Sequence, residues 1–152
     1  ALCFGLDARD VLGALPGFRP PRRRLEQIAS RGRITLYDDF AHHPTAIAST
    51  LAGLRARVGP ARILVALEAR SATMRRGVHR DALADSLAGA DGVYALAREG
   101  QGFDWAGVLA PLGGRCRGIH PTALELMDAI GQDWQPGDHI VLMSNGSFDG
   151  LS

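Results

Sequence analysis

From residue 44 onward, apolar positions follow two patterns that alternate along the chain. Ile47, Leu51, Leu54 and Val58 recur at intervals of four, three and four, which predicts one buried face of a helix that begins at Pro44. Residues 62–67 are almost continuously apolar, which is typical of a strand buried on both faces of a parallel sheet. The same two patterns predict further helices over 80–88, 105–112 and 123–134, and further strands over 92–96, 115–119 and 139–143.

The chain before residue 44 predicts a different arrangement. Residues 6–15 have the pattern of a short helix, and the Pro- and Gly-containing residues 16–21 end it and form the best candidate for a domain boundary. Two apolar stretches, 25–29 and 34–40, lie on either side of a tight turn. The sequence therefore predicts an α/β fold: a Rossmann-like, open, mostly parallel sheet with helices on both faces and an N-terminal antiparallel strand or hairpin.

Polar loops follow several of the predicted strands. Right-handed crossovers place the carboxyl ends of parallel strands along one edge, and ligands of such sheets bind in the crevice outside those ends. The best candidate loops are therefore residues 38–45, 68–77 and 144–150.

The first of these loops combines two carboxylates with two imidazoles. Asp38 and Asp39 can accept a hydrogen bond from a ribose hydroxyl or bind a hard cation. His42 and His43 can donate to an anion near the start of the next helix, where the helix dipole also favours negative charge. Two alternatives stay open: Asp39 or His43 could cap the helix, or the four side chains could hold a transition metal, although adjacent histidines point apart and seldom share one ion.

The other two loops offer donors and a flexible backbone. Residues 68–77 contain three arginines and two hydroxyl groups, and guanidinium groups bind carboxylates or phosphates bidentately. A solvated basic loop is the alternative interpretation. In residues 144–150, two glycines and short polar side chains would let the backbone approach a ligand closely.

Composition excludes several kinds of chemistry. The chain has 152 residues and a net charge of +1, and all 17 of its Lys and Arg residues are Arg. It therefore has no P-loop lysine, Schiff-base lysine or lysine general base, and it lacks the G-x-G-x-x-G fingerprint. The charge balance requires no nucleic-acid or membrane partner, and two distant cysteines fit isolated thiols in a reducing cytoplasm. The start of the chain, which lacks Met and a signal-peptide pattern, suggests a cut inside a longer protein.

One string of residues is specific enough to indicate a family. The stretch 37–47, Tyr-Asp-Asp-Phe-Ala-His-His-Pro-Thr-Ala-Ile, resembles the C-terminal domain of the Mur ligases, and within that family the murein peptide ligases. Residues 23–26 resemble the arginine-bearing strand that enters that domain, residues 70–74 its substrate loop, and residues 143–146 its last strand and loop. Two positions depart from the family pattern, because Ala69 stands for the usual Pro and Ala72 for the usual Asn.

The resemblance implies an ATP-dependent amide ligase of peptidoglycan recycling in the bacterial cytoplasm. Such enzymes join UDP-N-acetylmuramate to L-alanyl-γ-D-glutamyl-meso-diaminopimelate by activating the muramate carboxylate as an acyl phosphate, which the peptide amine attacks. An N-terminal domain holds the UDP-sugar, and a central domain holds the P-loop and most of the contacts to Mg²⁺. Residues 1–21 would then be the end of the central domain and a linker, and residues 22–152 the C-terminal domain, inactive alone, which closes over ATP.

The resemblance also implies roles for individual residues. His42 and Asp39 would be catalytic, and no residue of this chain would be a metal ligand. The nucleotide would be contacted by Arg24, Asp38 at the ribose, and Phe40. The incoming peptide would be bound by Arg70, Ser71, Thr73, Ser144, Asn145 and Gly146. Two alternative functions are the C-terminal domain of the UDP-N-acetylmuramate–L-alanine ligase, which needs fewer carboxylate contacts, and a non-catalytic α/β module that binds nucleotides or acidic peptides.

Overall fold

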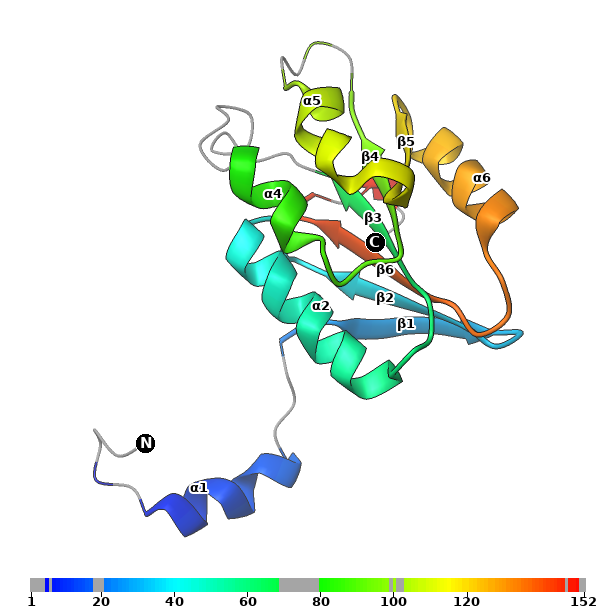
Figure 1. Ribbon diagram of the computed structural model, residues 1–152. Coiled ribbons are helices and arrows are strands. Elements are labelled where there is room, and N and C mark those ends of the chain that lie inside the picture. Colours follow the sequence, from blue (N-terminus) through cyan, green and yellow to red (C-terminus); the bar gives the residue numbers. More distant parts are fainter. Residues whose placement is uncertain are drawn as a thin grey trace.

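The computed structural model describes residues 5, 7–17, 21–68, 80–98, 100, 103–146 and 148–150. Its centre is a six-stranded sheet in the order β1-β2-β6-β3-β4-β5 (Figure 1). The strands are β1 (Glu26–Arg31), β2 (Ile34–Asp39), β3 (Ile63–Glu68), β4 (Gly92–Leu96), β5 (Cys116–His120) and β6 (His139–Ser144). β1 pairs with β2 antiparallel, and every other pair in the sheet is parallel. The predicted fold class, including its N-terminal hairpin, is confirmed.

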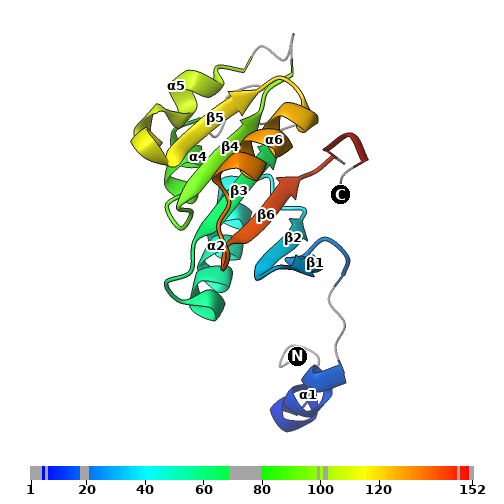
Figure 2. The same cartoon turned by 90° about the vertical axis from the view of Figure 1, so that its right-hand side faces the viewer.

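Helices cover both faces of this sheet. One core lies under α2 (Pro44–Val58), α4 (Arg80–Ser86) and α5 (Trp105–Leu109), and a second lies under α6 (Ala123–Asp133) (Figures 1 and 2). All six residues of β3 are buried, as expected for a strand between two layers. A separate short helix, α1 (Ala8–Ala14), is followed by a 3-10 turn, η2 (Leu15–Gly17), and Figure 1 shows α1 lying apart from the sheet.

The ends of α2 show how local sequence sets an element. Pro44 occupies the first turn, where its missing N–H costs nothing, and His43 caps the helix by accepting from Thr45 N at 3.3 Å. Gly59 ends the helix with a φ of 61°, a conformation that a side chain would oppose. Ile47, Leu51 and Leu54 are fully buried, as their spacing predicts.

The predicted helix over residues 105–112 is shorter in the structure. α5 ends at Leu109, and a 3-10 segment, η3 (Ala110–Arg115), continues to β5. Pro111 lies at the start of η3. Because proline has no N–H to donate, the regular α-helical hydrogen bonding stops at this position.

Register brings the carboxyl ends of the central strands together. Asp39 of β2 lies opposite Met143 of β6, and Glu68 of β3 lies opposite Ser144 of β6. The loops that follow β2, β3 and β6 therefore leave the sheet at one edge, which we call the carboxyl edge. A further 3-10 turn, η4 (Phe148–Gly150), follows β6 at this edge. Within the described ranges, the structure has no helix of the length and apolarity needed to cross a lipid bilayer.

Candidate functional site

The chain enters the sheet through a strained segment that Asp39 holds in place. Arg23 and Leu25 have φ values of 57° and 49°, a left-handed conformation that is unfavourable for side chains of this size. Asp39 is 2% exposed, and its Oδ2 accepts from Leu25 N at 2.6 Å. Its Oδ1 accepts from Ala41 N at 2.7 Å and from Thr50 Oγ1 at 3.4 Å. Through its two oxygens, Asp39 thus connects three segments: the entry segment, the loop that follows β2, and helix α2.

Asp38, the neighbouring carboxylate, has one paired and one unpaired oxygen. Oδ2 accepts from Arg23 Nε at 3.0 Å, and the same guanidinium donates from Nη2 to the Ser144 carbonyl at 2.8 Å. Oδ1 is buried and has no hydrogen-bond partner among the described residues. A buried acceptor without a hydrogen-bond partner is unfavourable. This unpaired oxygen is therefore better explained by a role in binding a ligand hydroxyl than by a purely structural role. Because Oδ1 is covered, a ligand can bond to it only after the atoms that cover it move.

The guanidinium groups of two arginines lie over the aromatic ring of Phe40. The guanidinium carbons of Arg23 and Arg24 lie 5.5 and 5.6 Å from the ring centroid, within the range of cation–π attraction. Arg24 is exposed and lines a hollow of about 360 Å³ together with Arg22 and Arg57. Three guanidinium groups against one carboxylate, Glu26, leave this hollow with a net positive charge, which favours an anionic ligand.

The two histidines after β2 have different hydrogen bonds. Nδ1 of His42 lies 2.9 Å from the Phe40 carbonyl, and a carbonyl only accepts, so Nδ1 carries the proton. Nε2 of His42 can then donate to a phosphate only when the ring is fully protonated. His43 instead caps α2 through Nδ1, as the capping alternative proposed.

Ser144 and Glu68 form a buried pair between β6 and β3. Both residues are 0% exposed, and Ser144 Oγ donates to Glu68 Oε2 at 2.6 Å. The same hydroxyl accepts from Gly146 N at 2.7 Å, so the Ser144 side chain is engaged on both sides within the chain. Arg98 donates from Nη2 to Glu68 Oε1 at 3.1 Å and to Asp149 Oδ1 at 2.6 Å, and these bonds, to Asp149 above all, raise the pKa of its guanidinium.

The carboxyl edge brings together most of the residues that the sequence indicated. Arg24, Asp38, Asp39, Phe40 and His42 lie around the end of β2, and Ser144, Asn145 and Gly146 lie at and just after the end of β6. Arg70, Ser71 and Thr73 lie outside the described residues.

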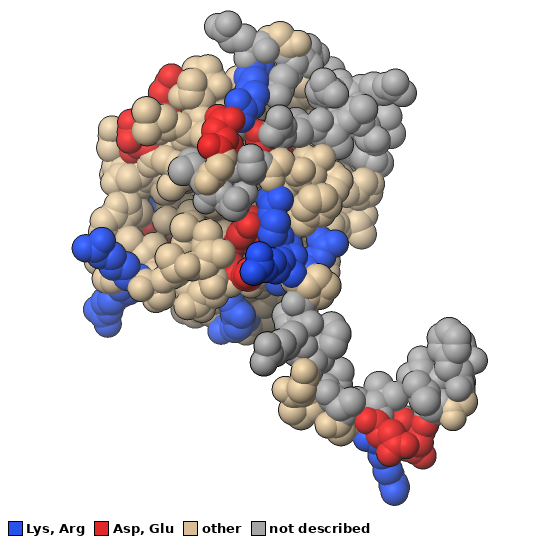
Figure 3. Space-filling model, turned by 180° about the vertical axis from the view of Figure 1, so that it is seen from behind, with Lys and Arg blue, Asp and Glu red and all other residues tan. Residues whose placement is uncertain are grey.

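Sequence reasoning gave no individual role to three charged residues of this edge, namely Arg23, Glu68 and Arg98, although the first two lie in segments that it singled out. For Glu68 a signal existed, because a carboxylate at the end of an otherwise apolar buried strand needs partners. Figure 3 shows basic and acidic surface lying side by side near the point where the connection to α1 leaves the sheet.

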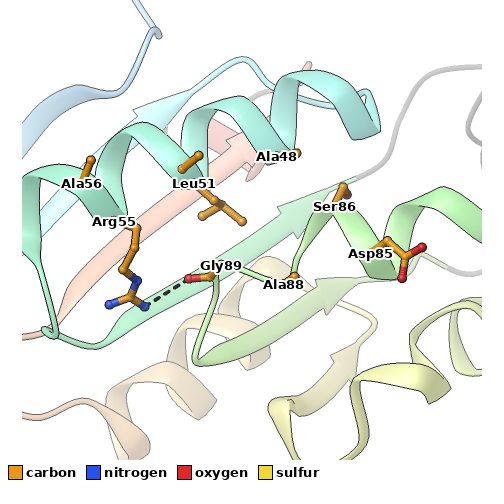
Figure 4. A pocket seen from close by; sticks show the side chains of 9 residues that line it. Ala48, Leu51, Arg55, Ala56, Asp85, Ser86, Ala88 and Gly89 are labelled. Atoms are coloured by element: carbon orange, nitrogen blue, oxygen red, sulfur yellow. Dashed lines mark hydrogen bonds between the residues drawn. The ribbon is translucent and has the colours of Figure 1, made fainter.

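A hollow elsewhere lacks comparable chemistry. About 460 Å³ lie between α2 and α4, lined largely by small side chains (Figure 4). Arg55 in this hollow already donates to the carbonyls of Gly59, Ala61 and Gly89 and to Asp91. Nor do the side chains that the structure describes include a group of three or more His, Cys, Asp or Glu placed to hold a metal ion.

Known proteins resemble the chain over nearly its whole length. The UDP-N-acetylmuramate–L-alanyl-γ-D-glutamyl-meso-2,6-diaminoheptandioate ligase of Escherichia coli K12 is 43% identical over 97% of the chain. The UDP-N-acetylmuramate–L-alanine ligase of Mycobacterium sp. strain JLS is 32% identical over 96% of it. The chain spans about a third of the length of these relatives, 32% in each case.

Solved structures agree with this relationship. A murein peptide ligase from Psychrobacter arcticus superimposes with a TM-score of 0.78 at 33% identity, over 91% of this chain and 30% of its own. A separately crystallised domain from Haemophilus ducreyi, named as part of a putative UDP-N-acetylmuramate:L-alanyl-γ-D-glutamyl-meso-diaminopimelate ligase, gives a TM-score of 0.70 at 42% identity. This match covers 84% of this chain and 93% of that domain. The family model described as "Mur ligase, glutamate ligase domain" matches residues 23–146. The chain therefore belongs to the Mur ligase family and contains the glutamate ligase domain of that family.

Proposed function

We propose that this chain is the C-terminal part of an ATP-dependent ligase that joins UDP-N-acetylmuramate to the murein tripeptide L-alanyl-γ-D-glutamyl-meso-diaminopimelate. The observation that carries the proposal is the 43% identity, over 97% of the chain, to the E. coli enzyme named for that reaction. The identity to an L-alanine-adding ligase is 32% over a similar length, so that activity is the second candidate.

The nucleotide is assigned to the end of β2. In this proposal Asp38 accepts a ribose hydroxyl through its unpaired Oδ1, and Arg23 holds the carboxylate in place through Oδ2. Arg24 and Phe40 flank the nucleotide, and protonated His42 donates from Nε2 toward a phosphate. Asp39 supports these residues by positioning the loop rather than by direct contact, because its oxygens already accept from three donors of the chain.

The proposed reaction transfers a phosphoryl group from ATP to the muramate carboxylate. The peptide amine then displaces phosphate, so an amide, ADP and phosphate are the products. Mg²⁺ would neutralise charge on the phosphates during the transfer. The chain contains no lysine, so a P-loop lysine must come from the rest of the enzyme, to which we also assign most ligands for Mg²⁺.

The tripeptide is assigned to the loops after β3 and β6. It has several carboxylates, which suit the guanidinium of Arg70 and the hydroxyls of Ser71 and Thr73. Asn145 and Gly146 follow β6 at the same edge and would lie near the peptide. We place residues 1–21 at the end of the preceding domain, and the reaction in the bacterial cytoplasm, where ATP and UDP-sugars are available.

The full-length enzyme that contains this chain provides the test. ADP release should require both UDP-N-acetylmuramate and the tripeptide, and L-alanine should replace the tripeptide poorly. The 152-residue chain alone should release no ADP under the same conditions, because it lacks a P-loop. ADP release that depends on L-alanine and ignores the tripeptide would favour the second candidate.

A further inference from the structure

Among the described residues, the carboxylate of Glu68 is the most deeply buried charge at the carboxyl edge. It ends β3, a strand whose other residues are all apolar, and it is 0% exposed. A buried carboxylate is unfavourable unless several donors surround it. Here Oε2 accepts from Ser144 Oγ at 2.6 Å and from Phe148 N at 3.3 Å, and Oε1 accepts from Arg98 at 3.1 Å.

Two of these donors, Ser144 Oγ and Phe148 N, belong to one turn, residues 144–150, and Arg98 reaches the same turn through Asp149. At its start, Ser144 Oγ also accepts from Gly146 N at 2.7 Å, so this hydroxyl links Gly146 to Glu68. At its end, Phe148 and Asp149 have φ values of 45° and 58°, which side chains of this size adopt only when other contacts enforce them. The bond from Phe148 N to Glu68 and the Arg98–Asp149 ion pair supply those contacts.

We propose that Glu68 is a positioning residue for the incoming peptide, because its carboxylate fixes the 144–150 turn that presents Asn145 and Gly146. This inference rests on the proposed function, which puts the peptide at that turn. Glu68 is also the residue from which the loop with Arg70 begins.

The nucleotide end of the site depends on Glu68 much less. Arg23 reaches Ser144 through the backbone carbonyl, and its guanidinium also donates to Asp38 and lies over the Phe40 ring. Neither bond uses the carboxylate of Glu68. Loss of that carboxylate should therefore disturb the peptide and leave ATP almost unaffected.

Glu68→Gln in the full-length enzyme tests this separation. Glutamine has the same shape but no charge, so it leaves Arg98 without its buried counterion. We expect the KM for the tripeptide to rise by about tenfold or more and the KM for ATP to stay within about twofold. Arg98→Lys keeps one charge without the guanidinium geometry and should raise the tripeptide KM by a smaller factor, which provides a second reading should Glu68→Gln not fold.

Asp133→Asn is the matched control. Asp133 also accepts from a buried group, Tyr94 OH, and pairs with Arg62, but it ends α6 at the opposite edge of the sheet. This variant should lower the melting temperature while both KM values stay at the wild-type level. A folded Glu68→Gln enzyme with an unchanged tripeptide KM, or with an equal rise in both KM values, would overturn the proposal.

The outcome for Glu68 can be separated from the outcome for the proposed function. If the wild-type enzyme accepts L-alanine instead of the tripeptide, the proposed substrate is wrong. The same comparison of acceptor KM with ATP KM, made with L-alanine, still decides whether Glu68 positions the acceptor.

Discussion

Arg23 Nε lies 3.0 Å from Asp38 Oδ2, and this ion pair joins the segment that enters the domain to the end of β2. The Asp38 side chain is 5% exposed and that of Arg23 is 26% exposed, so water screens the pair only partly. The same arginine binds the Ser144 carbonyl at the end of β6. A movement of the entry segment would therefore be transmitted directly to the proposed nucleotide site.

Asp38→Asn should weaken ATP binding while the domain keeps its structure. The amide oxygen can still accept from Arg23, but an NH₂ group replaces the second acceptor that we assign to the ribose. Loss of one hydrogen bond to a charged group costs roughly 1.5–3 kcal/mol, so the KM for ATP should rise by about tenfold or more. Steady-state kinetics of the full-length enzyme measure this, with the tripeptide KM as internal control. An unaltered ATP KM would leave Asp38 with a purely structural role.

Arg70→Ala should act on the other substrate. Removal of one guanidinium contact to a peptide carboxylate should raise the KM for the tripeptide by about tenfold or more, with little change in the KM for ATP. Arg31→Ala is a suitable control, because Arg31 is an exposed arginine at the end of β1. A normal tripeptide KM in Arg70→Ala would remove Arg70 from the peptide site.

Most of the fold could be predicted because its signals are local and repeated. The spacing of Ile47, Leu51 and Leu54 and the apolar run of β3 correspond directly to a helix face and a buried strand. The end of α5 at Leu109 was harder to predict, because Pro111 lies inside an otherwise helical pattern. Such a proline shows that the helix is interrupted but leaves open at which residue.

The sequence located the candidate site more easily than it distinguished the roles of the residues within it. Asp38 and Asp39 are adjacent carboxylates at the end of one strand, and the sequence cannot tell which of them faces a ligand. Their roles differ because successive side chains of a strand point to opposite faces, which gives Asp39 the backbone of Leu25 and Ala41 and gives Asp38 the guanidinium of Arg23.

Tyr94→Phe should lower the stability of the domain without changing the proposed binding site. Tyr94 is 2% exposed, and its OH donates to Asp133 Oδ2 at 2.5 Å. Burial and this bond raise the pKa of Tyr94, so the hydroxyl stays protonated at neutral pH. Loss of a hydrogen bond to a carboxylate should reduce the free energy of unfolding by roughly 1.5–3 kcal/mol, measured by urea denaturation of the 152-residue chain at pH 7.

The stability lost in Tyr94→Phe should also depend on pH. The hydrogen bond from Tyr94 is the main reason why the pKa of Asp133 lies below its ordinary value in the folded chain. A carboxyl with a lowered folded pKa stabilises the fold above its unfolded pKa of about 4 and loses that contribution as the pH falls through the folded pKa. The difference between wild type and Tyr94→Phe should therefore shrink as the pH falls below about 4. A difference that stays constant over this range would contradict the assigned bond.

The central claim, that this chain completes a ligase for a murein peptide, is tested most directly by a competition experiment. The full-length enzyme would be incubated with ATP, UDP-N-acetylmuramate and equal concentrations of the tripeptide and L-alanine, and the products identified by mass spectrometry. We predict that UDP-N-acetylmuramoyl-tripeptide is the main product. UDP-N-acetylmuramoyl-L-alanine as the main product, or no ligation product with either acceptor, would contradict the claim.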